Sequence, residues 1–372
     1  MKLTLITICA AICIFTNSYN QTVFNTGRIL IAENTEINIE GGIENSGLLS
    51  NAGYVHCNGN WINNGEYVDN NSIVILNGKE TQIVDHNNYS FGTLLIEGGD
   101  KIIKSNFTVS DELQLNHGLI IPEPDVEIRI SENAEITNAS EYSFVNGSLI
   151  HEGTGYKFFP IGKNRNYLPA ELHDLQGNSP VVKLEVFEPN PAPGIVEGLL
   201  WVSERRYWQK TIVSGSVESA LITLYYQDEN PVTIPDNLVV AESSSENRVF
   251  SSLGSTNYGA SNIQSSITGQ DVISEDIFAI AELNDFISIC NVITPNNDNV
   301  NDYLYIANIE EYPENEVVVL NRMGDKVYSA VSYQNDWDTS IDGKKLPNGN
   351  YVCIVKIEGY PNTFRQMITI LN

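Results

Sequence analysis

A glycine that recurs every six residues near the start of the chain limits the possible folds more than any other feature. The series is Gly41, Gly47, Gly53, Gly59 and Gly65. An apolar residue stands two positions after each glycine, namely Ile43, Leu49, Val55, Trp61 and Tyr67. A second series stands four positions after each glycine, namely Asn45, Asn51, Cys57, Asn63 and Asp69. A fixed short period of this kind indicates stacked repeats.

Each six-residue unit predicts a very short strand with one side chain in a common core, followed by a corner. At the corner, glycine would accept a positive φ and asparagine would bond to the neighbouring backbone. Stacking would align like residues into an apolar ladder inside and an asparagine ladder at the corner, which predicts a β-solenoid-like repeat region over residues 21–155. The alternative is a β-sandwich with hairpins at Asn58-Gly59, Asn64-Gly65 and Asn77-Gly78. The regular period favours the solenoid.

The remainder of the chain also predicts strands, so the expected fold class is all-β. No stretch keeps apolar residues at helical spacing, and short alternating runs are separated by Gly, Asn, Asp and Pro. Residues 156–286 have the strand spacing of an immunoglobulin-like β-sandwich. Within that region, we expect Trp201, Tyr207 and Trp208 to serve packing rather than ligand binding.

The first residues predict the compartment. Met1 and Lys2 precede an apolar run from 3 to 15, and the small residues 16–18 follow, which is the pattern of a signal peptide over residues 1–20. No second long apolar run predicts a transmembrane helix in the mature chain. The formal charge of −27 disfavours nucleic acid as a partner, because such a field repels phosphate.

Three cysteines remain after the signal peptide, too few for a fold held together by disulfides. We expect Cys57, Cys290 and Cys353 to be small apolar residues in the interior. Cys290 and Cys353 are the one pair that could share a domain and form a bridge.

Four motifs follow one another in the last part of the chain. They are I-T-P-N-N-D-N-V-N-D at 293–302, V-V-V-L-N-R-M-G-D-K-V-Y at 317–328, Y-Q-N-D-W-D at 333–338 and L-P-N-G-N-Y at 346–351. A short Y-P-x-N segment ending at Asn315 leads into the second motif. Taken together, residues 287–372 resemble the gliding-motility-associated, type B C-terminal sorting domain of proteins secreted by the type IX system of Bacteroidetes. Asn297 and Asn299 stand where the family has glycine, and Met323 stands where it has tryptophan.

The resemblance implies a small β-sandwich that acts as an export address. It implies the secretion machinery and an outer-membrane partner protein as partners, and a secreted or cell-surface location. Met323 is expected to fill the apolar slot of the family tryptophan. The residues that carry the resemblance are Thr294, Pro295, Asn296, Asp298, Asn301, Asp302, Asn321, Arg322, Gly324, Trp337, Pro347, Gly349 and Tyr351.

The first of these motifs is also the one candidate metal site. Asn296, Asp298 and Asp302 place oxygen side chains at near-alternate positions, as at the start of a calcium loop. The competing interpretation is a turn in which Asx side chains bond to the backbone. No other cofactor is predicted.

The search for catalytic motifs gives no candidate. The five histidines show no ligand pair, and no nucleophile elbow or phosphate-binding loop is present. We therefore expect no enzymatic activity, and we predict an adhesin-like or structural protein of the surface, with surface glycans or other cells as candidate partners. The rival hypothesis is a secreted carbohydrate-active enzyme that carries the same sorting domain, and a groove with facing carboxylates on the solenoid would favour it.

Overall fold

The structure is a computed structural model in which the described elements are β strands, apart from one 3-10 turn at Ile309–Glu311. It confirms the predicted all-β class. The chain divides into two compact units, Met1–Leu283 and Asn284–Asn372. Within the described part, no helix is long and apolar enough to span a bilayer. The predicted signal peptide lies outside the described residues, which are 22–372 without 196–198, 227–237, 256, 261–264, 284–286, 297, 299, 342 and 359–362.

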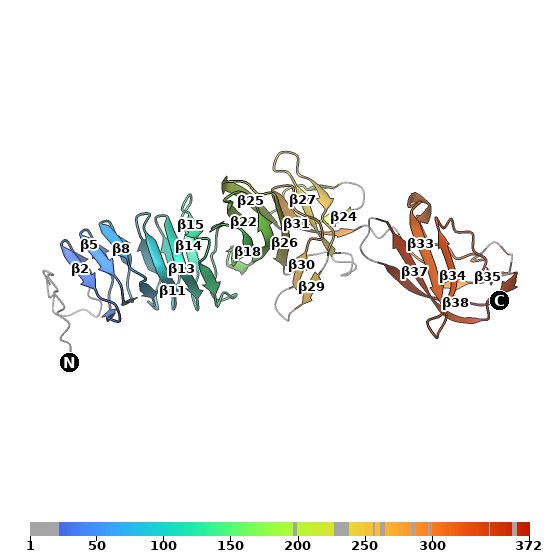
Figure 1. Ribbon diagram of the computed structural model, residues 1–372, viewed down its shortest axis with the longest axis horizontal. Coiled ribbons are helices and arrows are strands. Elements are labelled where there is room, and N and C mark those ends of the chain that lie inside the picture. Colours follow the sequence, from blue (N-terminus) through green and yellow to red (C-terminus); the bar gives the residue numbers. More distant parts are fainter. Residues whose placement is uncertain are drawn as a thin grey trace. The chain divides into compact units, whose positions relative to one another are not determined.

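The first unit begins with a β-solenoid of about seven turns, as the repeat predicted. Its first turns each contribute one strand to each of three parallel sheets, and the coils stack in register (Figure 1). Asn45 lies beside Asn63, 18 residues further along, which equals three six-residue units. Because the pairing is parallel, the alternative with Asn-Gly hairpins is wrong.

The three solenoid sheets have the following strands. The first contains β1 (Val23–Asn25), β4 (Ile43–Asn45), β7 (Trp61–Asn63), β10 (Gln82–Asp85), β12 (Lys101–Ile103) and β14 (Ile120–Pro122). The second contains β2 (Arg28–Ile31), β5 (Leu48–Asn51) and β8 (Glu66–Asp69). The third begins with β3 (Glu36–Ile39), β6 (Tyr54–Cys57), β9 (Ile73–Leu76), β11 (Ser90–Ile96), β13 (Phe107–Leu115), β15 (Ile128–Ile130) and β16 (Glu135–Thr137).

The repeat residues form the two predicted ladders. The apolar residue of every six-residue unit is buried in one continuous core. Asn25 Nδ2 donates to Asn45 Oδ1 at 2.6 Å, and Asn45 Nδ2 donates to Asn63 Oδ1 at 2.6 Å. Asn45 Oδ1 also accepts the amide of Gly47 at 3.2 Å, so the asparagines bond both to one another and to the corner backbone. These bonds satisfy polar groups that would otherwise be costly to bury.

The repeated glycines serve a purpose that differs from the prediction. None of them adopts a positive φ. Instead, a Cβ at Gly47 would lie 2.1 Å from the carbonyl oxygen of Gly27, and one at Gly65 would lie 2.2 Å from that of Gly47. Adjacent corners approach so closely that a side chain has no space, so contact between coils, and not local backbone conformation, requires glycine.

An aromatic cluster fills the middle coils. The indole of Trp61 donates to His86 Nδ1 at 3.0 Å, and the His86 ring stacks on Phe91 at 3.7 Å. Tyr67 lies edge-on to His86, with ring centroids 4.6 Å apart. His86 is fully buried, and this burial lowers its pKa to about 3. Since Nδ1 accepts a hydrogen bond, the ring is neutral and carries its proton on Nε2.

Two long polar side chains also lie inside the solenoid, at register-paired positions. Gln82 Nε2 donates to the carbonyl of Cys57 at 2.9 Å. The ammonium of Lys101 donates to the carbonyl of Glu97 at 2.8 Å, and burial lowers the Lys101 pKa to about 8. Each side chain therefore donates hydrogen bonds, from inside the solenoid, to carbonyl groups of the adjoining corners.

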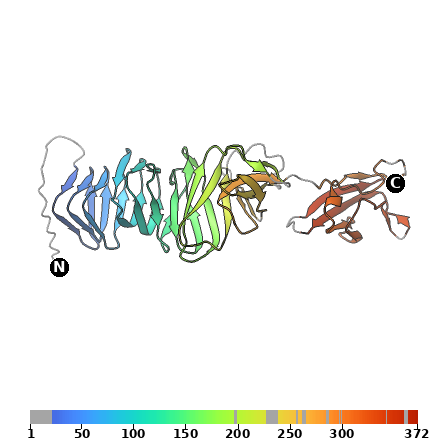
Figure 2. The same cartoon turned by 90° about the horizontal axis from the view of Figure 1, so that it is seen from above.

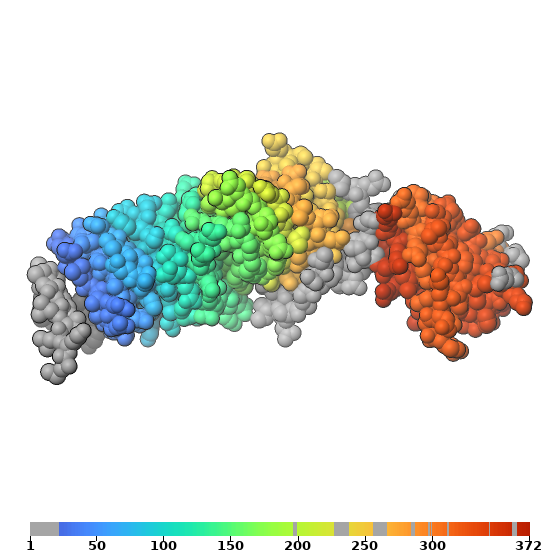
Figure 3. All heavy atoms as spheres, in the orientation of Figure 1, coloured from blue at the N-terminus to red at the C-terminus, as the bar shows by residue number. Residues whose placement is uncertain are grey.

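The third solenoid sheet continues directly into the middle region. β17 (Leu149–Glu152) pairs in parallel with β15 and antiparallel with β22 (Val181–Phe187), so that one sheet of 15 strands serves both regions (Figure 2). The space-filling view likewise shows one unbroken surface from the solenoid into the sandwich (Figure 3). The later strands of this sheet are β23 (Gly194–Ile195), β24 (Leu199–Val202), β25 (Tyr207–Ser214), β27 (Leu238–Ser243), β28 (Val249–Ser252) and β31 (Ile277–Leu283).

A second sheet of five strands covers the antiparallel part and completes a sandwich. Trp208 is fully buried between the layers, and its indole donates to the carbonyl of Leu168 at 3.1 Å. Tyr207 stacks on Phe187 at 5.0 Å, and the indole of Trp201 donates to Glu282, so the three aromatic residues serve packing. The second sheet contains β18 (Gly155–Phe159), β21 (Ala170–Gln176), β26 (Ser219–Tyr226), β29 (Asn257–Ala260) and β30 (Ser265–Thr268).

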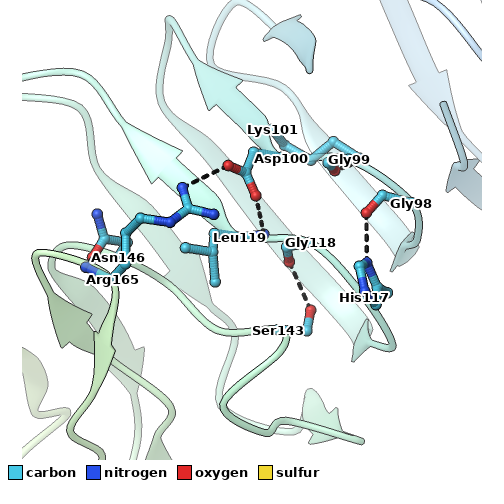
Figure 4. A network of polar contacts seen from close by, with 10 residues as sticks. All are labelled: Gly98, Gly99, Asp100, Lys101, His117, Gly118, Leu119, Ser143, Asn146 and Arg165. Atoms are coloured by element: carbon cyan, nitrogen blue, oxygen red, sulfur yellow. Dashed lines mark hydrogen bonds and ion pairs between the residues drawn. The ribbon is translucent and has the colours of Figure 1, made fainter. Parts of the chain in front are cut away.

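A short hairpin of the sandwich reaches back to the solenoid (Figure 4). It consists of β19 (Gly162–Lys163) and β20 (Asn166–Tyr167), and Arg165 at its turn donates to Asp100 Oδ2 at 2.8 Å. The other oxygen of Asp100 accepts the amide of Leu119 at 3.0 Å. Burial raises the pKa of Asp100, but the bonds from Arg165 and Leu119 lower it by more. The net shift of this pKa is therefore downward.

The second unit has its own core and one five-stranded mixed sheet. The sheet order is β32 (Val292–Ile293), β38 (Phe364–Ile370), β37 (Gly349–Ile357), β33 (Asn315–Leu320) and β34 (Lys326–Val331). The segment before β33 supplies Leu304 to the core of this unit, and the segment after β34 supplies Tyr333 and Trp337. Both Cys57 and Cys353 are buried, Cys290 is half-buried, and all three are free thiols. Between β34 and β37 lies a small hairpin of β35 (Ser340–Ile341) and β36 (Lys344–Lys345).

Candidate functional site

Three of the four C-terminal motifs emerge at the same end of the five-stranded sheet. Leu320, the last residue of β33, pairs with Val352 near the start of β37. Gly349, the first residue of β37, pairs with Ile370, and Ile370 in turn pairs with Ile293. Three segments that are far apart in the sequence therefore extend from this end of the sheet: the loop 294–302, the turn 321–325 and the turn 346–348. We call them the motif loops.

The turn 321–325 is organised by its first residue. Asn321 Oδ1 accepts the amides of Met323 at 2.8 Å and Asp325 at 3.0 Å. Gly324 has φ +88, in the left-handed region where glycine is favoured. Arg322 is exposed, and Met323 is 86% exposed. The expectation that Met323 fills an apolar slot is therefore wrong, because the turn directs its side chain into solvent.

The turn 346–348 is held from both sides. Tyr351 is buried on β37, and its hydroxyl donates to the carbonyl of Pro347 at 2.9 Å. The amide of Asn372 donates to Asn348 Oδ1 at 2.8 Å, and Asn372 Nδ2 donates to the carbonyl of Leu346 at 2.6 Å. These bonds fix the last residue of the sequence beside the motif loops.

The described residues of the loop 294–302 are joined by Asx bonds from side chains to the backbone. Asn296 Oδ1 accepts the amide of Asp298 at 2.9 Å, and Asp298 Oδ1 accepts the amide of Val300 at 2.8 Å. Thr294 donates through Oγ1 to the carbonyl of Val300 at 3.1 Å, and its amide donates to the carbonyl of Asn301 at 2.7 Å. The Lys345 ammonium donates to the carbonyl of Pro295 from the neighbouring hairpin.

These bonds bear on the calcium hypothesis. One side-chain oxygen of Asn296 and one of Asp298 bind loop amides, the arrangement expected of a turn held by its own side chains. Asp302 is buried. Among the described residues, no group of three His, Cys, Asp or Glu side chains is placed to hold a metal ion. Asn297 and Asn299 lie outside the described residues, and the calcium loop stays a prediction.

The remaining motif, at 333–338, contributes to the core of the module. Trp337 is 5% exposed and stacks on Tyr328 with ring centroids 4.1 Å apart. The Tyr333 hydroxyl donates to the carbonyl of Leu304 at 2.6 Å and accepts the amide of Trp337 at 3.2 Å. Burial is the main reason that the pKa of Tyr333 is raised well above its usual value.

Two asparagines that were absent from the predicted site residues anchor this core. Asn315 is 2% exposed, accepts the amide of Tyr333 at 2.8 Å and donates to the carbonyl of Tyr312 at 2.7 Å. Asn335 has φ +61 and exchanges bonds with the backbone of Ile306, accepting its amide at 2.7 Å. Both stand within quoted motifs, and a single asparagine two or three residues after a tyrosine is a usable signal for such a backbone anchor.

The geometry defines a small all-β module with its own core and with three of its four motifs gathered at one end of the sheet. Residues 287–370 match the family model of the CHU_C type IX secretion signal domain. The second unit is therefore a type IX secretion signal domain, and the chain carries an address for export by that system to the outside of the cell. No curated protein and no solved structure shows significant similarity to the chain.

Proposed function

We propose that the chain is a non-enzymatic, adhesin-like or structural protein that the type IX system exports through residues 287–372 and places at the cell surface or in the medium. The export part is carried by one observation, the match of a secretion signal domain to a separately packed unit. An outer-membrane partner protein is the expected receptor of that unit. The role outside the cell rests on the first unit.

The motif loops are the proposed contact with the secretion machinery. Arg322 and Met323 are exposed there, and the backbone of the turns 321–325 and 346–348 is fixed by side-chain bonds. A preorganised loop loses little conformational entropy when it binds, which favours recognition. Trp337, by contrast, is buried and acts through the fold of the module.

A fractionation experiment tests the export proposal. Deletion of residues 287–372 should leave the protein in the periplasm with its signal peptide removed. Trp337→Ala should also reduce export, since loss of a buried aromatic side chain costs about 3–5 kcal/mol. Arg322→Ala should reduce export without changing the melting temperature, and Lys356→Ala at an exposed position on β37 is the matched control. Export of the deletion variant at the normal level would contradict the proposal.

The first unit supports an adhesin-like role through its construction. A sheet of 15 strands joins solenoid and sandwich over a shared core, and this gives a rigid, extended surface for contact with a partner. The acidic charge of −27 keeps nucleic acid an unfavourable partner. A glycan and cell-surface binding screen with the chain lacking residues 287–372 tests this role, and absence of binding to every glycan and cell type would favour a purely structural one.

One observation favours the rival, a carbohydrate-active enzyme. A hollow of about 690 Å³ on the solenoid is lined by Glu40, Glu44 and Glu80 together with Lys79. All three glutamates are exposed, and Glu40 accepts a bond from Asn58 Nδ2 at 3.0 Å. A general acid of a glycosidase needs a carboxyl whose pKa is raised by an apolar pocket, and this hollow is rich in Asn and Gly. Polysaccharide cleavage that Glu44→Gln abolishes would establish the enzyme.

A further inference from the structure

The outer face of the sandwich carries a cluster of aromatic side chains around one carboxylate. Tyr156 and Phe158 lie on β18, Glu171 lies on β21, and Tyr225 lies on β26. Phe158 is the register partner of Glu171. With Tyr167 of β20 and Pro169, these residues line a cavity of about 220 Å³ that opens to solvent. That volume is roughly seven times the share of a water molecule in the liquid, so a small organic group fits.

Glu171 holds the centre of the cluster. Its Oε1 accepts the Tyr225 hydroxyl at 2.9 Å, and its Oε2 lies 3.1 Å from His173 Nε2. Its side chain is 15% exposed. Burial and then the hydrogen bond to Glu171 raise the pKa of Tyr225 to about 12, and burial and then the charge of Glu171 raise that of Tyr156. Burial also raises the pKa of Tyr167, so the three tyrosines stay protonated, and Glu171 is the carboxylate that lines the cavity.

The ring faces add to this charge. The face of an aromatic ring is electrostatically negative and attracts cations. Tyr156 is 57% exposed and lies 5.4 Å from the His173 ring, while Tyr167 is backed by Phe144 at 5.2 Å. Among the described residues that line the cavity, none is Lys or Arg.

The polar atoms of the site are largely engaged already. His173 Nε2 lies 2.9 Å from Thr223 Oγ1, and Thr223 in turn bonds to Thr268 at 2.8 Å. A sugar, which needs many hydrogen-bond partners, would find few of them free. A cation with an apolar surface needs only ring faces and a nearby negative charge.

We propose that this tyrosine cavity binds an alkylated ammonium group, with the rings of Tyr156, Phe158 and Tyr225 around the cation and Glu171 as its counter-charge. The site is separate from the export module and does not depend on the proposed function. Free quaternary amines and the headgroups of choline lipids share this chemistry.

Calorimetric titration of the full mature chain with choline tests the proposal, with 3,3-dimethylbutan-1-ol as the neutral analogue of the same shape. Choline should bind at least about tenfold more tightly than the alcohol, since a desolvated cation–π contact gives a preference of that order. Glu171→Gln should weaken choline binding by about tenfold, and Tyr156→Ala should weaken it similarly. Tyr142→Ala removes a tyrosine that is 65% exposed outside the cavity, and should change nothing.

Circular dichroism of each variant verifies the fold, and Tyr156→Ala is the decisive change because its exposed ring contributes little to the core. Equal binding of choline and the alcohol, no binding of choline, or unchanged binding by Tyr156→Ala would overturn the proposal. Sedimentation with phosphatidylcholine vesicles, against phosphatidylglycerol vesicles, then identifies the source. Vesicle binding that Tyr156→Ala abolishes assigns the site to a lipid headgroup, and choline binding without it assigns the site to free amines.

Discussion

Replacement of Trp61 by alanine tests the stacked core of the solenoid most directly. The indole is fully buried, and its ring lies 5.7 Å from Phe91 and 6.0 Å from Tyr67. Loss of a buried Trp side chain costs about 3–5 kcal/mol, through lost transfer energy and the cavity that remains. The change also removes the hydrogen-bond donor of His86 Nδ1, and an unsatisfied buried acceptor costs a further ~1–3 kcal/mol. We expect Trp61→Ala to lower the free energy of unfolding by at least about 3 kcal/mol.

The matched control is Glu66→Ala, five residues along in the same coil. Glu66 is exposed, and it contributes its backbone carbonyl, not its carboxylate, to the asparagine ladder. Its replacement should change stability by less than about 0.5 kcal/mol. Thermal melting of the two variants, followed by near-ultraviolet circular dichroism, makes the comparison. Equal shifts of the melting temperature would refute the model of a buried ladder.

Two further predictions concern the same coils. The pKa of His86 is about 3 in the folded chain and about 6.5 in the unfolded chain. Between these pH values only the unfolded chain protonates His86, so the free energy of unfolding decreases as the pH falls from about 6.5 toward 3. The slope is about 1.4 kcal/mol per pH unit for this group, and urea titrations at pH 7 and 4 should show a smaller loss in His86→Gln than in the parent. Gly47→Ala should destabilise the solenoid by more than about 1 kcal/mol, because its Cβ would lie 2.1 Å from a carbonyl oxygen. Gly269→Ala, whose Cβ would meet nothing closer than 3.4 Å, is the control, and an equal effect of both would contradict the role assigned to the corner glycines.

The sequence predicted the solenoid because three six-residue repeats correspond to one coil of 18 residues. Every apolar repeat residue from Ile43 to Tyr67 is buried, and Asn45 and Asn63 form the expected ladder. The reason for the glycines could not be found in the same way. A local pattern describes the conformation of one corner, whereas the short distance from Gly47 to Gly27 arises only when the next coil is in place.

The polar interior was not predictable either. Lys101 stands in the alternating sequence of a strand, and its charge would place it outside. It is buried because the corner turns leave carbonyl groups that point inward, and a long donor reaches them. Such a requirement depends on the shape of neighbouring turns, which the pattern of one strand does not contain.

In the C-terminal module, the ordered motifs predicted the signal domain but not its geometry. Trp337 was expected in the core and is buried, whereas Met323 was expected inside and is exposed. The three loops lie at one end of the sheet because of the strand register, in which Gly349, for example, pairs with Ile370. The tyrosine cavity was missed because its residues come from four strands, and Tyr225 is 54 residues from its partner Glu171 in the sequence.

The register of the solenoid has a consequence for how the length of this protein can vary. Ile43 of one coil occupies the same position as Trp61 of the next, and Leu48 the same position as Glu66. Excision of residues 43–60 would bring β1 against β7 with every ladder still aligned, since each coil contacts only its neighbours. The gain or loss of one whole coil would thus alter the length of the solenoid in fixed steps, while the sandwich, its tyrosine cavity and the export module stay unchanged.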